Sequence, residues 1–147
     1  MPNRKGFTLL ELIIVIVIGT ILSGIVLLAF SQVQGQLAVR NANASFLSLH
    51  SQARAFAVER GENVRFVVDR DAVQVRVELV SSGEVLNSLS FGQEFDVTMT
   101  GSGSSELVFT PRGVADGSGS RFTVEFVRGP RNRTVEVLQL GQAREIG

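Results

Sequence analysis

The sequence predicts an α+β protein in which a long N-terminal helix packs on a small antiparallel β head. Three observations lead to this prediction. Residues 7–39 carry only one ionisable side chain, Glu11. Apolar residues then recur every three or four positions from Val39 to Phe56, as on one face of a helix. After Gly61 the apolar period changes to two, which is typical of strands with one buried face.

The N-terminal apolar run is long enough to cross a membrane. Residues 12–30 contain no charge and no proline, and as a helix they would extend about 28 Å. A helix is the one single segment that satisfies its own backbone in lipid. Arg4 and Lys5 precede the run, so the short N-terminus is expected to stay in the cytoplasm while the rest is exported. We therefore predict a transmembrane segment over about residues 7–31.

Two simpler readings of this segment leave Glu11 unexplained. One is a secretory signal peptide cleaved after residues 29–31, and the other is a plain membrane anchor. A carboxylate inside a membrane costs a few kcal/mol and marks a functional site by default. If the chain were cut between Gly6 and Phe7, the new α-amino group would lie one helical turn from Glu11. It would also be able to meet the Glu11 of a neighbouring subunit.

Residues 4–12, Arg-Lys-Gly-Phe-Thr-Leu-Leu-Glu-Leu, resemble the processing signature of type IV pilins and type II secretion pseudopilins. The resemblance implies that a prepilin peptidase cuts after Gly6 and methylates Phe7. It also implies that Glu11 helps to recruit the subunit into a filament, with other pilins or pseudopilins and an inner-membrane assembly platform as partners. The proline common midway along such helices is absent, with Leu28 near that position, so no kink is expected there.

The helix is expected to end at Arg60, because a glycine follows it and because a basic side chain in the last turn stabilises the C-terminal end of a helix. This divides the chain into a leader (1–6), a helix (7–60) and a head (61–147). A head of this size buries only a modest core by itself. The apolar stripe of residues 39–56 is therefore expected to complete that core, so that helix and head form one folding unit.

Seven short strands are predicted in the head. Turn signals rich in glycine, serine and proline separate them, which favours an antiparallel sandwich or a twisted pair of sheets. The predicted ranges are 63–68, 73–79, 85–91, 95–100, 106–110, 121–127 and 133–140.

Two later segments extend the family resemblance. Residues 52–61, followed by Val64, resemble the helix end of GspH/FimT-type minor pseudopilins. Residues 109–113, Phe-Thr-Pro-Arg-Gly, resemble the Phe-x-Pro-x-Gly turn of the same group. The resemblance implies a pilin-like fold, in which a long helix packs on two small antiparallel sheets.

The composition argues against catalysis, metals and cofactors. The chain has no cysteine and a single histidine, His50, which is expected to be a boundary residue. Asp69 and Asp71 are separated by an arginine and lack the further oxygen ligands of a calcium loop. Asp116 is a lone carboxylate. We predict no enzyme activity, no cofactor and no metal site, and leave calcium binding as a remote alternative.

Nucleic-acid binding is the weaker reading of the C-terminal arginines. Arg128, Arg131 and Arg133 flank a Gly-Pro turn, and Arg144 follows nearby. FimT-like competence pilins, which this chain resembles, carry a Gly-Arg-x-Arg motif near this point; here residues 141–144 read Gly-Gln-Ala-Arg. The chain has no tyrosine or tryptophan to stack on bases. We expect a solvated turn and keep DNA contact as the alternative.

The predicted function is that of a minor pseudopilin in a type II secretion pseudopilus, with a structural and assembly role in protein export. We expect it in the bacterial inner membrane as a single-pass protein with its head in the periplasm. A minor pilin of a type IV pilus, serving assembly, adhesion or DNA uptake, stays open as the alternative. A membrane-anchored β domain that binds a ligand alone is the third reading. Removing Arg4 and Lys5 from 14 basic and 14 acidic side chains would leave the mature chain slightly acidic.

Overall fold

The computed structural model describes residues 8–117 and 121–146, without the side chains of residues 25–29 and 31. It divides into two units, Met1–Gln34 and Gly35–Gly147. One helix, α1 (Leu9–Arg60, 52 residues), contributes to both. Each unit is described by itself.

In the first unit, the described side chains of α1 are exposed from Leu9 onward. Two of the described hydroxyl groups of this part of α1 donate to the helix's own carbonyls, Thr20 Oγ1 to Val17 O at 2.8 Å and Ser23 Oγ to Gly19 O at 2.7 Å. This arrangement lets polar side chains sit on an apolar helix without another partner.

The predicted membrane span lies in this unit. Within the part of the chain that the structure describes, no helix combines the length and the apolarity that a bilayer crossing demands. Several residues of the predicted span 7–31 lie outside the described residues or their described side chains: Phe7, residues 25–29 and Ser31. The span therefore stays a prediction.

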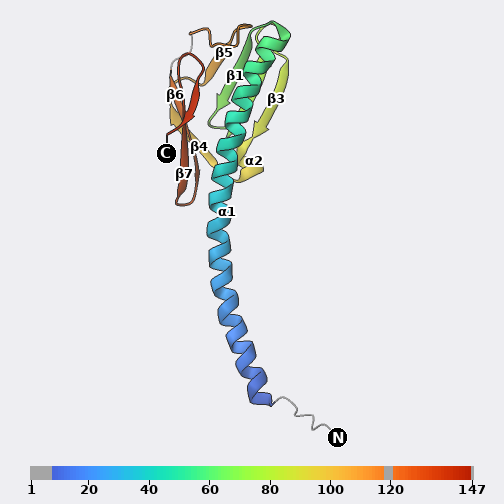
Figure 1. Cartoon of the computed structure of the whole chain (residues 1–147), viewed down its shortest axis with the longest axis vertical. Helices are drawn as coiled ribbons and strands as arrows, with labels where there is room; N and C mark the ends of the chain where they lie inside the picture. Colours follow the sequence, from blue (N-terminus) through green and yellow to red (C-terminus); the bar gives the residue numbers. More distant parts are fainter. Residues whose placement is uncertain (1–7, 118–120, 147) are drawn as a thin grey trace. The chain divides into compact units, whose positions relative to one another are not determined.

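The second unit contains two four-stranded antiparallel sheets (Figure 1). One has the order β3-β2-β1-β5 and the other β4-β6-β7-β8. A short helix, α2 (Phe91–Phe95), follows β3. The strands are β1 (Val64–Asp69), β2 (Gln74–Leu79), β3 (Val85–Ser90), β4 (Thr98–Ser102), β5 (Glu106–Phe109), β6 (Phe122–Arg128), β7 (Arg131–Val137) and β8 (Ala143–Glu145).

The C-terminal half of α1 supplies one layer of the core of this unit, as its apolar stripe predicts. Val39, Ala42, Phe46 and Ala53 are all buried against the sheets. The Phe46 ring is fully buried, with its centroid 5.4 Å from that of Phe66 on β1 and 5.7 Å from that of Phe126 on β6. Because one helical side chain touches both sheets, residues 35–60 fold together with the head.

The strand predictions are confirmed in outline and wrong in several places, two of which lie in the first half of the head. Phe95 does not begin a strand: it closes α2, because Phe91 and Phe95 are spaced four apart and their rings pack at 5.8 Å. Asp96 then ends this helix in the left-handed conformation, with φ of 53°, and β4 starts only at Thr98. Val73 lies outside β2, with φ of 51° in the preceding turn.

The end of the chain differs too. The predicted strand 133–140 ends at Val137, because the chain turns there, with Gly141 N donating to Leu138 O at 2.8 Å. An additional strand, β8, then pairs with β7. Its three residues are too few for an alternating pattern, and two of them are charged.

Candidate functional site

The first candidate site is the start of α1, where Glu11 occupies the first helical turn. Thr8 precedes the helix; its Oγ1 accepts a hydrogen bond from Glu11 N, and its carbonyl accepts one from Leu12 N, both at 3.2 Å. Thr8 thus acts as the N-cap of α1, because its hydroxyl satisfies an otherwise free helix amide. A threonine just before the helix is the sequence signal of this cap, and the prediction of Glu11 as a filament residue did not include it.

This hydrogen bond involves the backbone of Glu11, and the filament role of its side chain stays a prediction. Its side chain is exposed, and no described residue pairs with its carboxylate. A negative charge in the first turn also favours the positive end of the helix dipole. The predicted processing residues, Gly6 and Phe7, lie outside the described residues.

The second candidate site is the set of C-terminal arginines, of which the strand register places Arg144 on the opposite face of the sheet from the other three. Residues of β7 alternate between the two faces of their sheet, so Arg133 lies on the core side with Val135. Arg144 lies opposite Glu136, on the outer face. Arg128 and Arg131 occupy opposite positions in the register of β6 and β7, next to the turn that joins these strands.

Three of these four arginines bind carboxylates within the chain. Arg128 Nη2 lies 3.0 Å from Asp96 Oδ2, and Arg144 Nη2 lies 2.7 Å from Glu136 Oε2. Arg133 pairs with Glu145. Each pairing neutralises charge that phosphate binding would need. Within the described residues, Arg131 is exposed and is the one member of this set without an acidic partner.

These pairings instead attach the C-terminal strand. Glu136 on β7 is 1% exposed, and the guanidinium groups of Arg121 and Arg144 bracket its carboxylate. Glu145 on β8 accepts a hydrogen bond from the buried Asn43 Nδ2 of α1 at 3.0 Å. A buried carboxylate requires such partners, since desolvation alone would strongly disfavour its charge. Two of the arginines that suggested nucleic-acid contact, Arg133 and Arg144, thus hold β8 on β7, and Asn43 holds it on the helix.

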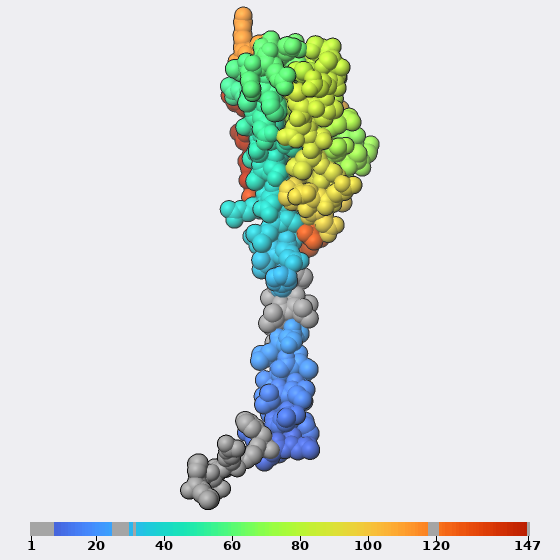
Figure 2. Space-filling view, turned by 90° about the vertical axis from the view of Figure 1, so that its right-hand side faces the viewer, coloured from blue at the N-terminus to red at the C-terminus, as the bar shows by residue number. Residues whose placement is uncertain are grey.

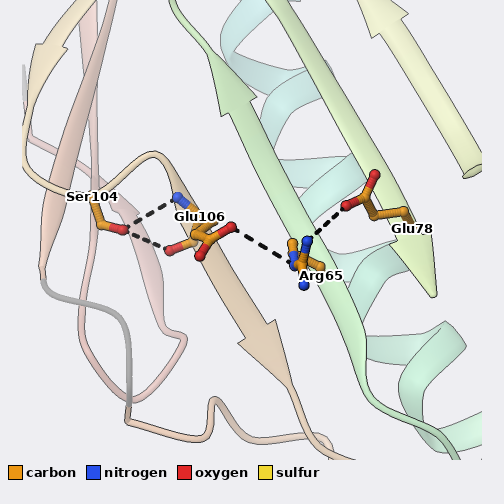
Figure 3. A network of polar contacts seen from close by, with 4 residues as sticks. All are labelled: Arg65, Glu78, Ser104 and Glu106. Atoms are coloured by element: carbon orange, nitrogen blue, oxygen red, sulfur yellow. Dashed lines mark hydrogen bonds and ion pairs between the residues drawn. The ribbon is translucent and has the colours of Figure 1, made fainter. Parts of the chain in front are cut away.

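The outer face of the other sheet holds a second closed network (Figure 3). Arg65 on β1 lies between Glu78 on β2 and Glu106 on β5, with nitrogen–oxygen distances of 3.2 Å and 3.7 Å. Ser104 Oγ donates to Glu106 O at 2.9 Å and accepts from Glu106 N at 3.2 Å. The three strands are thereby tied in register, and the charges of this face are largely satisfied internally.

One residue considered for metal binding, Asp69, has another role. Asp69 Oδ1 accepts a hydrogen bond from Ala72 N at 2.9 Å and so caps the turn between β1 and β2. Across the described residues, no group of three or more acidic, histidine or cysteine side chains is placed to hold a metal ion.

His50 is buried rather than at a boundary. Its ring lies edge-on to Phe66 and Phe109, at centroid distances of 5.5 and 5.2 Å. Burial, aided by the charge of Arg54, lowers the pKa of His50 to about 4.

Two protein-family models match this chain, one at its N-terminus and one over the rest of the helix and most of the head. Residues 1–27 match the family model described as "Prokaryotic N-terminal methylation motif", and residues 42–141 match the one described as "Type II transport protein GspH". No curated protein sequence matches the chain significantly.

Solved structures with a similar fold include two pilin-like proteins. The type IV minor pilin FimU of Pseudomonas aeruginosa aligns with a TM-score of 0.57 at 16% identity, over 80% of this chain and 91% of its own. A second crystal form of FimU gives 0.54 at 18% identity, over 76% and 92%. The minor pseudopilin EpsH of the Vibrio cholerae Type 2 Secretion System gives 0.57 at 12% identity, over 74% and 95%. These likenesses show a pilin-like fold, with a helix packed on two antiparallel sheets.

The GspH match covers more than half of the chain and spans α1 from Ala42, both sheets and the turn before β8. The chain therefore belongs to the family of type II transport protein GspH.

Proposed function

We propose that this protein is a minor pseudopilin, a non-enzymatic subunit of the periplasmic pseudopilus of a type II secretion system. The observation that carries the proposal is that two family models match one chain. An N-terminal methylation motif occupies residues 1–27, and the GspH match begins at residue 42 on the same helix. The first belongs to chains that are processed at a membrane, and the second to a transport apparatus.

The N-terminal chemistry follows from three residues. A prepilin peptidase cuts between Gly6 and Phe7 and methylates the new Phe7 amine. The carboxylate of Glu11, without a described partner, then pairs with the amine of a preceding subunit while apolar residues 12–30 pack in the membrane. An ion pair out of water needs both charges, so a subunit with neutral residue 11 enters the filament poorly.

The head has a mechanical task in this proposal. It contains no cysteine, so no disulfide stabilises it. Its stability comes from burying the Val39–Ala57 face of α1 between the sheets. Movement of α1 into a filament therefore carries the head along, and other pseudopilins and the inner-membrane assembly platform are the expected partners.

Processing is tested by mass spectrometry of the full chain extracted from membranes. An N-methylated Phe7 terminus supports the proposal. An intact Met1 would indicate a plain anchored domain, and a start at Gln32 an ordinary secreted protein.

The role of Glu11 is tested by Glu11→Gln, with Glu11→Ala beside it. Glutamine keeps a side-chain oxygen that can accept a hydrogen bond at the start of the helix, but it removes the negative charge. We expect Glu11→Gln to be cleaved normally and to be missing from the filament. If it assembles like the wild type while Glu11→Ala does not, Glu11 acts as a helix cap and not as an ion-pair partner.

A minor pilin of a type IV pilus is the second candidate, favoured by the likeness to FimU. Deletion of the chain separates the two. Loss of protein secretion with normal surface pili supports the pseudopilin, and loss of pili with normal secretion supports the pilin.

A further inference from the structure

A groove runs between α1 and the edge strand β3. Its volume is about 200 Å³, and it is lined from the helix by Ser45, Ser48, Leu49 and Gln52 and from the strand by residues 87–89. Figure 2 shows the helix and the β3–α2 segment side by side on this face.

The groove is lined by neutral hydrogen-bonding groups. Asn87 Nδ2 on β3 donates to Gln52 Oε1 at 2.9 Å, and Gln52 Nε2 donates to Ser48 Oγ at 3.1 Å. Each side chain keeps unused capacity, such as the carbonyl oxygen of Asn87 and the hydroxyl proton of Ser48. No charged residue lines the groove. It therefore suits a polypeptide segment with small or amide side chains better than a charged ligand.

β3 is an edge strand whose outer side is unprotected. β3 contains neither a charged residue nor a proline, the usual protections of an edge strand. Within the described residues, no hydrogen bond reaches its backbone from the side away from β2. A strand of six residues thus presents unpaired backbone groups beside a groove.

Two of the other three edges are covered or charged. The segment after β5 folds back on it, with Asp116 N donating to Val108 O at 3.0 Å. β8 has three residues, two of which are charged. β4 also lacks charged residues, and Arg70 Nη2 reaches the carbonyl of its last residue, Ser102, at 3.4 Å. Of these two uncharged edges, β3 is the one that lines the groove, so it is the place where another chain can both add a strand and insert side chains.

We propose that β3 and this groove receive an extended, uncharged segment of a neighbouring subunit, which pairs with the β3 backbone and extends its sheet. The inference rests on the proposed function. Alternate side chains of the added strand would lie in the groove against Ser48 and Gln52, while the backbone supplies the affinity. Ser48 also belongs to the small, exposed face of α1, with Ala44, Ser51 and Ala55, so a subunit packed along that face reaches the groove.

The first test places a charge on the open edge. Ser88→Lys adds a lysine to β3, and Thr100→Lys adds the same residue to the exposed strand β4 of the other sheet as a matched control. Lysine on an edge opposes strand addition. We expect Ser88→Lys in the filament fraction to fall about tenfold or more below Thr100→Lys, with equal membrane levels and equal melting temperatures of the full chain in detergent. Equal incorporation of the two variants overturns the inference.

The second test does not depend on a disruptive variant. Because the chain lacks cysteine, Ser48→Cys and Thr100→Cys each provide a single thiol. Both should react with a maleimide at similar rates in detergent, and Ser48→Cys should react about tenfold more slowly in the filament. Unchanged relative rates refute the inference. Absence of the wild-type chain from any filament instead refutes the proposed function, and the inference falls with it.

Discussion

His50 makes the stability of the head dependent on pH, and the size of the effect follows from its surroundings. The side chain is 6% exposed and lies between Phe66 and Phe109. Its Nε2 is buried without a hydrogen-bond partner, and Arg54 follows one helical turn later. Burial in this apolar setting, with the nearby positive charge of Arg54, lowers the pKa of His50 from 6.5 to about 4.

The folded chain therefore keeps His50 neutral in mild acid, whereas the unfolded chain protonates it. Because the unfolded state then binds more protons, stability falls as the pH drops. The contribution of His50 is complete above its unfolded pKa of 6.5 and is lost progressively down to its folded pKa of about 4. The loss amounts to about 2 kcal/mol at pH 5 and about 3 kcal/mol below pH 4, since one pKa unit corresponds to about 1.4 kcal/mol.

The assay is urea unfolding of residues 35–147 at pH 7.5 and at pH 5, for the wild type and for His50→Phe. Phenylalanine has a similar shape and does not titrate, and the carboxylates titrate in both proteins. We expect the wild type to lose about 2 kcal/mol more than the variant between the two pH values. Equal losses would show that His50 is accessible or protonated in the folded state and would refute the reasoning. If His50→Phe does not fold, His50→Leu serves the same comparison.

Three further predictions concern the same unfolding measurement. Phe46→Ala removes a fully buried ring that touches both sheets and should cost about 3–5 kcal/mol; a loss below 1 kcal/mol would mean that the helix is not part of the core. Replacing Arg121 or Arg144 singly with alanine should cost about 1 kcal/mol, whereas the double variant should cost about 3–5 kcal/mol because Glu136 is then buried unpaired; additive losses would contradict this. Gly101→Ala should prevent folding or cost several kcal/mol, because φ is 144° and the new Cβ would lie 2.0 Å from a carbonyl oxygen of β6; normal stability would disprove that approach.

Periodic burial explains why most of the fold was predictable. The stripe from Val39 to Ala53 and the alternation of Val75, Val77 and Leu79 each reflect one buried face, which a sequence displays directly. The helix α2 was not predicted because Phe91 directly follows a strand, and the five residues from Phe91 to Phe95 are too few to show a helical period. β8 was not predicted for a similar reason, since three residues are too few to show an alternation of apolar and polar side chains.

The candidate sites were predictable only where the chemistry is local. Thr8 and Glu11 are three residues apart, so the N-cap bond between them can be read from the sequence. The burial of Glu136 depends on Arg121, just before β6, and on Arg144 of β8, and only the strand pairing brings these residues together. Asn43 and Glu145 are 102 residues apart, and their hydrogen bond has no sequence signal.

The location of the core determines how assembly defects are to be interpreted. Every buried apolar residue of the described core lies between Ala38 and Val137, within the unit Gly35–Gly147. A variant such as Phe46→Ala weakens that unit and would reduce assembly simply by lowering the amount of folded head. Glu11 lies outside the unit, so Glu11→Gln should leave the unfolding of the head in the full chain unchanged. A filament defect in Glu11→Gln with normal head stability therefore reports on subunit recruitment itself.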